Sequence, residues 1–265
     1  MFRTPQVLKA QAHASLTLTP TMNYHFASGE MFVPIVFSEM ADVAREYPLV
    51  FLKDRALPVA LTGIEQGVNA YVAEDGQWLA TYIPGRIRSY PFALTEVPEQ
   101  KGEFAIAFDS EAAQVGTDDG QPLFDASGKP SAALQTRIDL LQQMKQQEAR
   151  TAQMLKTLRD FGILVERSIR IKRADGEDSQ LTGMEVVDEK ALNGLPLEVF
   201  GELRDQGLLP LIYAHLLSMA NLRHGAIAGK YPQMAQPQAK ATQGPRTSDE
   251  LFDEGDEDFT FDFGD

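Results

Sequence analysis

The chain has 265 residues, a net charge of −14 and no cysteine, so it can bury a sizeable core but can form neither a disulfide nor a cysteine-ligated zinc site. Residues 249–265 hold nine acids and no base, and without them the net charge is −5. A body so close to neutral lacks the basic surface of a nucleic-acid-binding protein, and no run of about 18 apolar residues is present to span a membrane.

The first half of the chain predicts mainly strands. Residues 1–22 alternate loosely and end near Pro20, which indicates an N-terminal strand. Ser38 is placed to cap a helix that runs to Arg45, and Pro48 then ends this helix and starts a buried strand, "LVFL". The segments "PVALTGI", "NAYVAEDGQWLATYI" and "EFAIAFD" read as further strands, and the Asp75-Gly76 pair predicts a hairpin within the second of them.

The second half predicts helices around one more hairpin. Apolar residues recur at helical spacing over 131–161, which predicts one long amphipathic helix ended by Gly162. Alternating residues over 163–187 predict a second hairpin, which could extend the first sheet, and Asp188 is placed to cap a short helix. Two more helical stretches follow, separated by Gly207 and Pro210.

These elements predict an α+β fold, in which an antiparallel sheet built from hairpins is packed by the long helix and the C-terminal helices. We expect one domain over residues 1–231. Residues 232–265 begin with a stretch rich in Gln, Ala and Pro and end in the acidic segment, so we expect a disordered linker and tail.

One stretch, "DGQWLATYIPGRIRSYPF" at 75–92, concentrates aromatic and basic side chains. On an extended strand Trp78 and Tyr82 share one face, and a turn at Gly85 would direct Arg86 and Arg88 away from it. Such a rim could bind a ligand, with Trp78, Tyr82 and Tyr90 as aromatic surface and the two arginines holding a carboxylate, phosphate or sugar.

The alternative interpretation, which we favour on the sequence alone, is that these rings belong to the core. The arginines would then hold loop carbonyls or the carboxylates of Glu65 and Asp75.

Catalytic and metal-binding motifs are missing from the sequence. The four histidines have no metal-ligand spacing, so no metal site is predicted, and neither phosphate-binding glycine motif occurs, so no cofactor is predicted. His215 lies among apolar residues and reads as a core histidine. If the protein were an enzyme, Glu65, Asp75 and Tyr82 would be its nearest acid-base candidates.

The acidic tail interleaves its carboxylates with Phe259, Phe261 and Phe263. It could serve only as a solvated end. It could also dock onto a partner that offers a basic groove and an apolar pocket, and it has some similarity to uncleaved export signals of type I secretion substrates. We favour solvation or docking over export.

Four blocks of the sequence resemble the SapC family of bacterial proteins, from about Tyr24 to about Leu222. They are "EMADVAREYPLVFLKD", "PVALTGIEQGVNAYVAEDGQWLATYIPGRIRSYPFAL", "LTGMEVVDEKALNGLP" and "GLLPLIYAHLLSMANL". The most specific features, in order, are Tyr47-Pro48, Asn69, Asp75-Gly76, Trp78, the 82–84 run and the 88–92 run.

The resemblance implies a role linked to a bacterial surface layer, and related genes lie beside those of TonB-dependent receptors, halogenase-like proteins and cupin-type oxygenases. It implies no defined reaction. A peptide-uptake permease shares the family's label but must span the membrane, so it is a different kind of protein.

Two hypotheses follow for the function. The first is an accessory or binding protein for a glycan, a peptide or a partner protein, linked to surface-layer or outer-membrane functions. The second is an enzyme, or the obligate partner of one, in a small-molecule pathway.

We predict a cytoplasmic protein, because residues 1–20 contain no apolar run of the length found in cleaved secretory signals. Fractionation of cells that express the full chain or a chain without residues 249–265 tests this prediction. Both chains should remain in the cytoplasmic fraction. Extracellular protein that disappears on truncation would instead assign an export signal to the tail.

Overall fold

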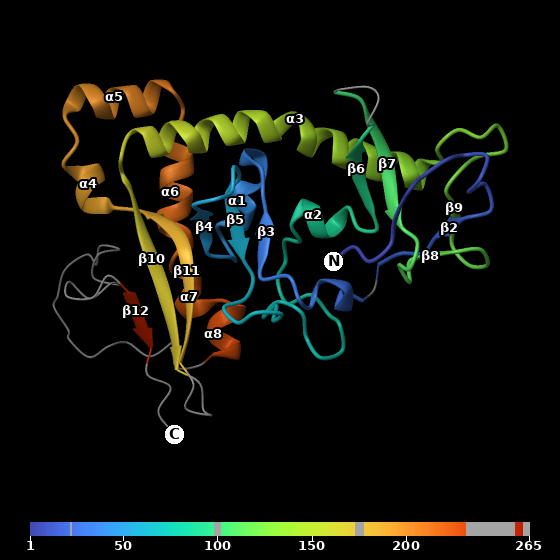
Figure 1. The fold of residues 1–265 in the computed structure, drawn as a ribbon, viewed down its shortest axis with the longest axis horizontal. Coiled ribbons are helices and arrows are strands. Elements are labelled where there is room, and N and C mark those ends of the chain that lie inside the picture. Colours follow the sequence, from blue (N-terminus) through green and yellow to red (C-terminus); the bar gives the residue numbers. More distant parts are fainter. Residues whose placement is uncertain (22, 98–101, 173–177, 232–257, 262–265) are drawn as a thin grey trace.

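The computed structural model describes residues 1–21, 23–97, 102–172, 178–231 and 258–261, and it confirms the α+β class (Figure 1). Its helices are α1 (Met40–Val43), α2 (Gly85–Arg88), α3 (Ala132–Asp160), α4 (Glu189–Asn193), α5 (Leu197–Asp205), α6 (Leu209–Ser218), α7 (Asn221–His224) and α8 (Ala226–Lys230), with 3-10 turns at His25–Ala27 and Phe37–Glu39. None of these helices is long and apolar enough to cross a membrane.

Within the described residues the strands form three sheets. They are β1 (Pro5–Val7), β2 (Thr17–Leu18), β3 (Phe32–Pro34), β4 (Leu49–Leu52), β5 (Val59–Leu61), β6 (Phe92–Glu96), β7 (Phe104–Asp109), β8 (Val115–Gly116), β9 (Gln121–Pro122), β10 (Leu164–Lys172), β11 (Asp178–Val187) and β12 (Asp258–Phe261). The largest sheet has the order β12-β10-β11-β4-β5-β3, and the two smaller ones have the orders β1-β7-β6 and β8-β2-β9. All pairs are antiparallel except β12 with β10.

Helix α3 extends across both halves of the molecule, from the large sheet to the two small ones (Figure 1). Ser131 caps it by accepting a hydrogen bond from the N–H of Leu134 at 3.3 Å, so the predicted helix over 131–161 is confirmed. Near its C-terminal end, Leu155 and Leu158 are fully buried in the large core. Nearer its N-terminus, Leu134 and Leu141 pack into a second, smaller core with Phe92 and Phe108, among others. One helix therefore supports two hydrophobic cores.

The hairpin predicted over 163–187 is confirmed as β10 and β11. It does extend the sheet of the first half, because Met184 pairs with Leu52 and Glu185 with Phe51 on β4.

Two expectations for residues 1–48 were wrong. Residues 1–22 do not form one strand, because β1 and β2 belong to different sheets. Ser38 does not cap the following helix, since the helical backbone already begins at Phe37. Glu39 acts at this end instead, where its carboxylate accepts the N–H of Val36 at 3.3 Å.

The tail contributes the edge strand β12, whose residues 258–261 run parallel to residues 168–171 of β10. The predicted linker at 232–257 and Phe263 lie outside the described residues. Docking of a partner by the tail stays a prediction, as does the single domain over 1–231.

Two side chains of helix α6 (Leu209–Ser218) form hydrogen bonds with the backbone of Leu49, the first residue of β4. Ser218 accepts the N–H of Leu49 at 2.8 Å, and the carbonyl of Leu49 accepts the Nδ1–H of His215 at 2.7 Å. The Nε2 of His215 accepts the N–H of Val187 at 3.1 Å. Both ring nitrogens are thus satisfied only in the neutral imidazole, and burial lowers the pKa of His215 to about 4.

This histidine makes the stability of the fold depend on pH. Because the pKa is lower in the folded chain than in the unfolded one, the unfolded chain takes up more protons between about pH 6.5 and pH 4. The contribution of the neutral histidine to the free energy of unfolding is fully present above about pH 6.5. As the pH falls to about 4, this contribution decreases by on the order of 3 kcal/mol.

We predict that His215→Gln has a lower free energy of unfolding than the wild type at about pH 7. On acidification to about pH 4, however, this free energy should fall less in the variant than in the wild type. Urea denaturation across this window measures both curves. Carboxylate titration is common to both proteins, so parallel curves would contradict the assignment.

Candidate functional site

The Asp75-Gly76 turn forms as predicted. Gly76 has a φ of +86°, its N–H donates to the carbonyl of Ala73 at 2.9 Å, and the carboxylate of Asp75 accepts the N–H of Gln77 at 2.9 Å. The ribbon predicted on either side of the turn was wrong, however, because it is reduced to a single bridge between Val72 and Trp78. The segment 79–84 is irregular, so its backbone groups need partners other than a strand.

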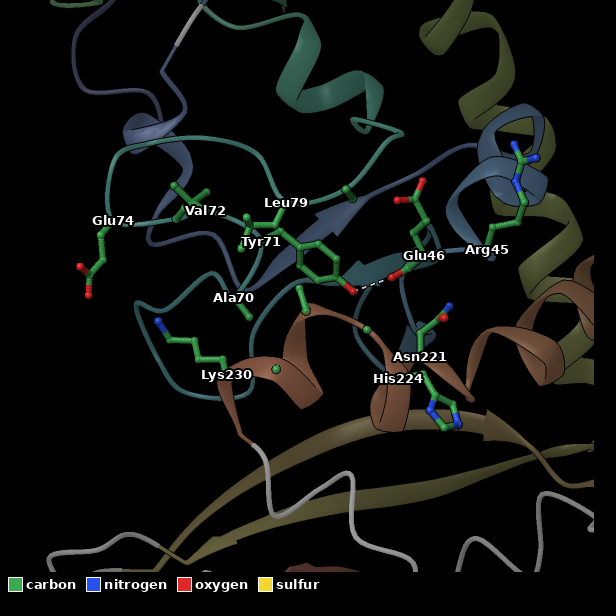
Figure 2. A pocket seen from close by; sticks show the side chains of 15 residues that line it. Arg45, Glu46, Ala70, Tyr71, Val72, Glu74, Leu79, Asn221, His224 and Lys230 are labelled. Carbon is green, nitrogen blue, oxygen red and sulfur yellow. Dashed lines mark hydrogen bonds between the residues drawn. The ribbon is translucent and has the colours of Figure 1, made fainter.

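Glu46, which follows α1, supplies the first of these partners. Its carboxylate accepts the N–H of Thr81 at 2.6 Å and the N–H of Tyr82 at 2.9 Å. Its carbonyl accepts the hydroxyl hydrogen of Tyr71 at 2.7 Å, and this bond is drawn in Figure 2. Glu46 therefore holds the chain on both sides of the turn.

Tyr47 supplies a second partner for the backbone of this segment. Its hydroxyl donates to the carbonyl of Tyr82 and accepts the indole N–H of Trp78 at 2.7 Å. Its ring stacks on that of Tyr71 with centroids 4.3 Å apart. Burial raises the pKa values of Tyr47 and Tyr71, so both phenols stay protonated and remain donors. We call Glu46 and Tyr47 together the Glu46–Tyr47 corner.

A pocket of about 570 Å³, which we call the corner pocket, opens beside this corner (Figure 2). It is lined by residues 45–46, 70–74, 79–80, 221, 224–226 and 229–230. Its walls therefore combine Glu46 of the corner, the chain around the turn, and helices α7 and α8.

Asn221 and Gly225 bring α7 and α8 to the pocket. The side-chain amide of Asn221 donates to the carbonyls of Ala44 and Tyr47, at 2.9 and 3.2 Å. Gly225 packs so closely that a Cβ there would lie 2.7 Å from the carbonyl oxygen of Asn221 and 3.2 Å from the Tyr71 hydroxyl. Gly229 differs, since a Cβ on it would meet no atom within 4 Å. It faces open space where it lines the pocket.

Apolar and polar side chains both line the corner pocket. Leu79 lines it with 53% of its surface exposed, which is unusual for a leucine. Glu74 and Lys230 stand at one end of the pocket in Figure 2, and neither has an ion pair within the part of the chain that the structure describes. A ligand with an apolar body and polar groups of either sign matches this lining.

The predicted aromatic site residues are held inside the protein. Trp78 is 7% exposed and Tyr90 is 4% exposed. The hydroxyl of Tyr82 donates to Glu39 at 2.9 Å, and burial, with the nearby Glu39 carboxylate, raises the pKa of Tyr82. Burial and the hydrogen bond from its hydroxyl to Asp109, at 3.1 Å, raise the pKa of Tyr90 to about 12.

The predicted arginines lie on the short helix α2, where we expected a turn. Arg86 forms an ion pair with Glu148 of α3. Arg88 donates to the carbonyl of Ile83 at 2.8 Å, and its guanidinium lies over the ring of Tyr82, 5.4 Å from the centroid. Every residue of the predicted site thus has an intramolecular partner, and a ligand at this site stays a prediction.

The three acid-base candidates lie in different surroundings. Asp75 is exposed at its turn, Glu65 is partly exposed, and Tyr82 is half-buried beside Glu39. None of them lines the corner pocket.

A scan against protein families matches the SapC family over residues 8–224. The chain therefore belongs to the SapC family, as the sequence blocks indicated. Searches of curated proteins and of solved structures found no match.

Sequence reasoning missed the corner pocket, because none of the predicted ligand-site residues lines it. Asn221, His224 and Lys230 carry no motif, and they reach the site only through packing of α7 and α8. One signal was present in Gly225, because a glycine beside a helix permits close approach of the chain, and a Cβ there would lie 2.7 Å from the carbonyl oxygen of Asn221.

We predict that Tyr47→Phe lowers the free energy of unfolding by about 1 to 3 kcal/mol, because it leaves the indole N–H of Trp78 and the carbonyl of Tyr82 without a partner. Urea denaturation measures the loss. The control is Tyr213→Phe on α6, where the ring is 46% exposed and the change should stay within about 0.5 kcal/mol. Equal midpoints for Tyr47→Phe and the control would show that the corner does not stabilise the fold.

Proposed function

We propose that this SapC-family protein is a binding protein that holds a small ligand in the corner pocket and works as an accessory to surface-layer or outer-membrane functions. The observation that carries this proposal is that the pocket's walls are already hydrogen-bonded in place. Glu46, Tyr71 and Asn221 all hold backbone groups, so a ligand would meet a preformed site. Preformed sites bind with less loss of conformational entropy.

The pocket's size and lining support a small ligand. A volume of about 570 Å³ is within the range of roughly 300 to 1,000 Å³ that small-molecule sites occupy. Leu79 and Ala80 offer apolar contact, while Glu74 and Lys230 offer charges of both signs. We therefore expect an amphipathic small molecule, or the end of a peptide or glycan chain.

Binding fits these residues better than catalysis does. The carboxylate inside the pocket wall belongs to Glu46, and each of its oxygens accepts a backbone N–H. A carboxylate used in this way orients the chain and is poorly placed to abstract a proton from a substrate. The family resemblance supports the link to the cell surface, and we retain cytoplasmic residence as a proposal.

We predict that Gly229→Leu blocks the pocket. The new side chain enters open space and raises helix propensity, so the fold should tolerate it. Native mass spectrometry of protein purified from its own cells measures bound ligand, and retention should fall on the order of tenfold or more.

The matched control is Gly201→Leu, on α5, where a Cβ also meets nothing within 4 Å and which does not line the corner pocket. It should retain ligand as the wild type does. Equal retention by both variants would remove the corner pocket as the site. A wild-type protein that carries no ligand and shows no thermal shift with a small-molecule extract of the same cells would contradict the proposed function.

A further inference from the structure

A second pocket, of about 370 Å³, lies beside the N-terminal segment. We call it the N-terminal pocket, and the residues that matter to it here are Arg3, Phe26, Tyr90, Glu111 and Gln114. None of these lines the corner pocket.

Two stacked rings form one wall of the N-terminal pocket. Phe26 and Tyr90 lie with centroids 4.0 Å apart and an interplanar angle of 14°. Phe2 contacts Tyr90 edge to face at 5.4 Å, and the Tyr90 hydroxyl donates to Asp109. The wall is therefore fixed before any ligand arrives, and its accessible apolar surface is mainly that of Phe26, because Tyr90 is buried beneath it.

Gln114 also lines the N-terminal pocket, and the oxygen of its side-chain amide is unsatisfied. The residue is 8% exposed, and its side-chain oxygen is buried with no hydrogen-bond partner in the described part of the chain. Such an orphaned acceptor costs about 1 to 3 kcal/mol. The terminal torsion of glutamine is soft and roughly two-fold, so the amide can turn its oxygen toward a donor in the pocket.

Asp109 holds one basic and one acidic residue, Arg3 and Glu111, at this pocket. Its carboxylate accepts the N–H groups of Arg3 and Thr4, each at 2.9 Å, and that of Glu111 at 3.3 Å. These backbone bonds hold Arg3 and Glu111 at the pocket, but the two side chains form no ion pair with each other. Among the described residues the Arg3 guanidinium forms no hydrogen bond or ion pair, although its charge acts on the nearby Tyr90 hydroxyl. One Glu111 oxygen accepts the hydroxyl hydrogen of Thr4 at 2.6 Å.

We propose that the N-terminal pocket binds a free α-amino acid with an apolar side chain. Arg3 pairs with its carboxylate, Glu111 and the Gln114 amide oxygen accept its ammonium hydrogens, and its side chain lies on the Phe26–Tyr90 wall. A zwitterion supplies a carboxylate for Arg3 and ammonium hydrogens for Glu111 and the Gln114 oxygen in one molecule. This site does not depend on the function proposed for the corner pocket.

The probe for this site is L-phenylalanine, titrated at millimolar concentration and followed by ligand-observed NMR and calorimetry. One molecule should bind per chain. Phenylalaninamide lacks the carboxylate and N-acetyl-phenylalanine lacks the ammonium, so each should bind on the order of tenfold more weakly or not at all. No saturation transfer from the protein to L-phenylalanine, or equal binding of all three compounds, would overturn the proposal.

Two variants test the residues. Gln114→Leu removes the orphaned acceptor, so the free protein should be at least as stable as the wild type while binding of L-phenylalanine is lost. Arg3→Gln should weaken binding with little effect on stability. Retained binding in both variants would overturn the assignment.

Gly229→Leu separates this proposal from the previous one, because it should leave L-phenylalanine binding unchanged while it blocks the corner pocket. Loss of phenylalanine binding in Gly229→Leu would place the amino acid in the corner pocket and overturn the N-terminal site.

Discussion

The carboxylate of Glu46 and the hydroxyl of Tyr47 substitute for a missing strand. The chain between Tyr71 and Tyr82 crosses the face of the large core with one bridge and no ladder, yet buried backbone groups require partners. The Glu46–Tyr47 corner supplies them for Thr81 and Tyr82. Hydrogen bonds to a charged group are stronger than neutral ones, and the one to Tyr82 is partly buried while the one to Thr81 is exposed and weakened by solvent. Two side chains thus take the place of ladder bonds at this point of the chain.

The corner also explains why the pocket lies where it does. Asn221 donates to the carbonyls of Ala44 and Tyr47 on the same turn of chain, so the last helices are attached where the irregular segment is attached. The corner pocket is the space left between these two attachments (Figure 2). At the smaller core, Asp109 has a comparable role, since its carboxylate gathers backbone N–H groups from both sides of the N-terminal pocket. In each case a carboxylate accepts several backbone N–H groups, and the pocket lies beside that carboxylate.

Sequence patterns predicted the elements whose stability is local. The Ser131 cap with the period of α3, the β10–β11 hairpin, and the Asp188 cap, which accepts the N–H of Ala191 at 3.0 Å, all depend on residues close in the chain. The 79–84 segment failed for the opposite reason. Its alternation predicts a strand, but the backbone groups of Thr81 and Tyr82 find their partners in side chains more than 30 residues away.

The same contrast holds for the sites. The crowding of aromatic residues at 75–92 was visible, and the structure uses Trp78 and Tyr82 to secure the chain beside the corner pocket. Asn221 and Lys230, which line the pocket from the other side, could not be predicted because they meet the first half of the chain only after packing. Gln114 was equally hidden, since an unsatisfied amide is defined by its surroundings and not by its neighbours in sequence.

Amide hydrogen exchange at Thr81 and Tyr82, measured by NMR in the wild type and in Glu46→Ala, tests the role of the corner most directly. We expect both amides to be protected in the wild type and to lose that protection in the variant, while the amides of α3 keep theirs. Unprotected amides at Thr81 and Tyr82 in the wild type, or unchanged protection in Glu46→Ala, would contradict this role.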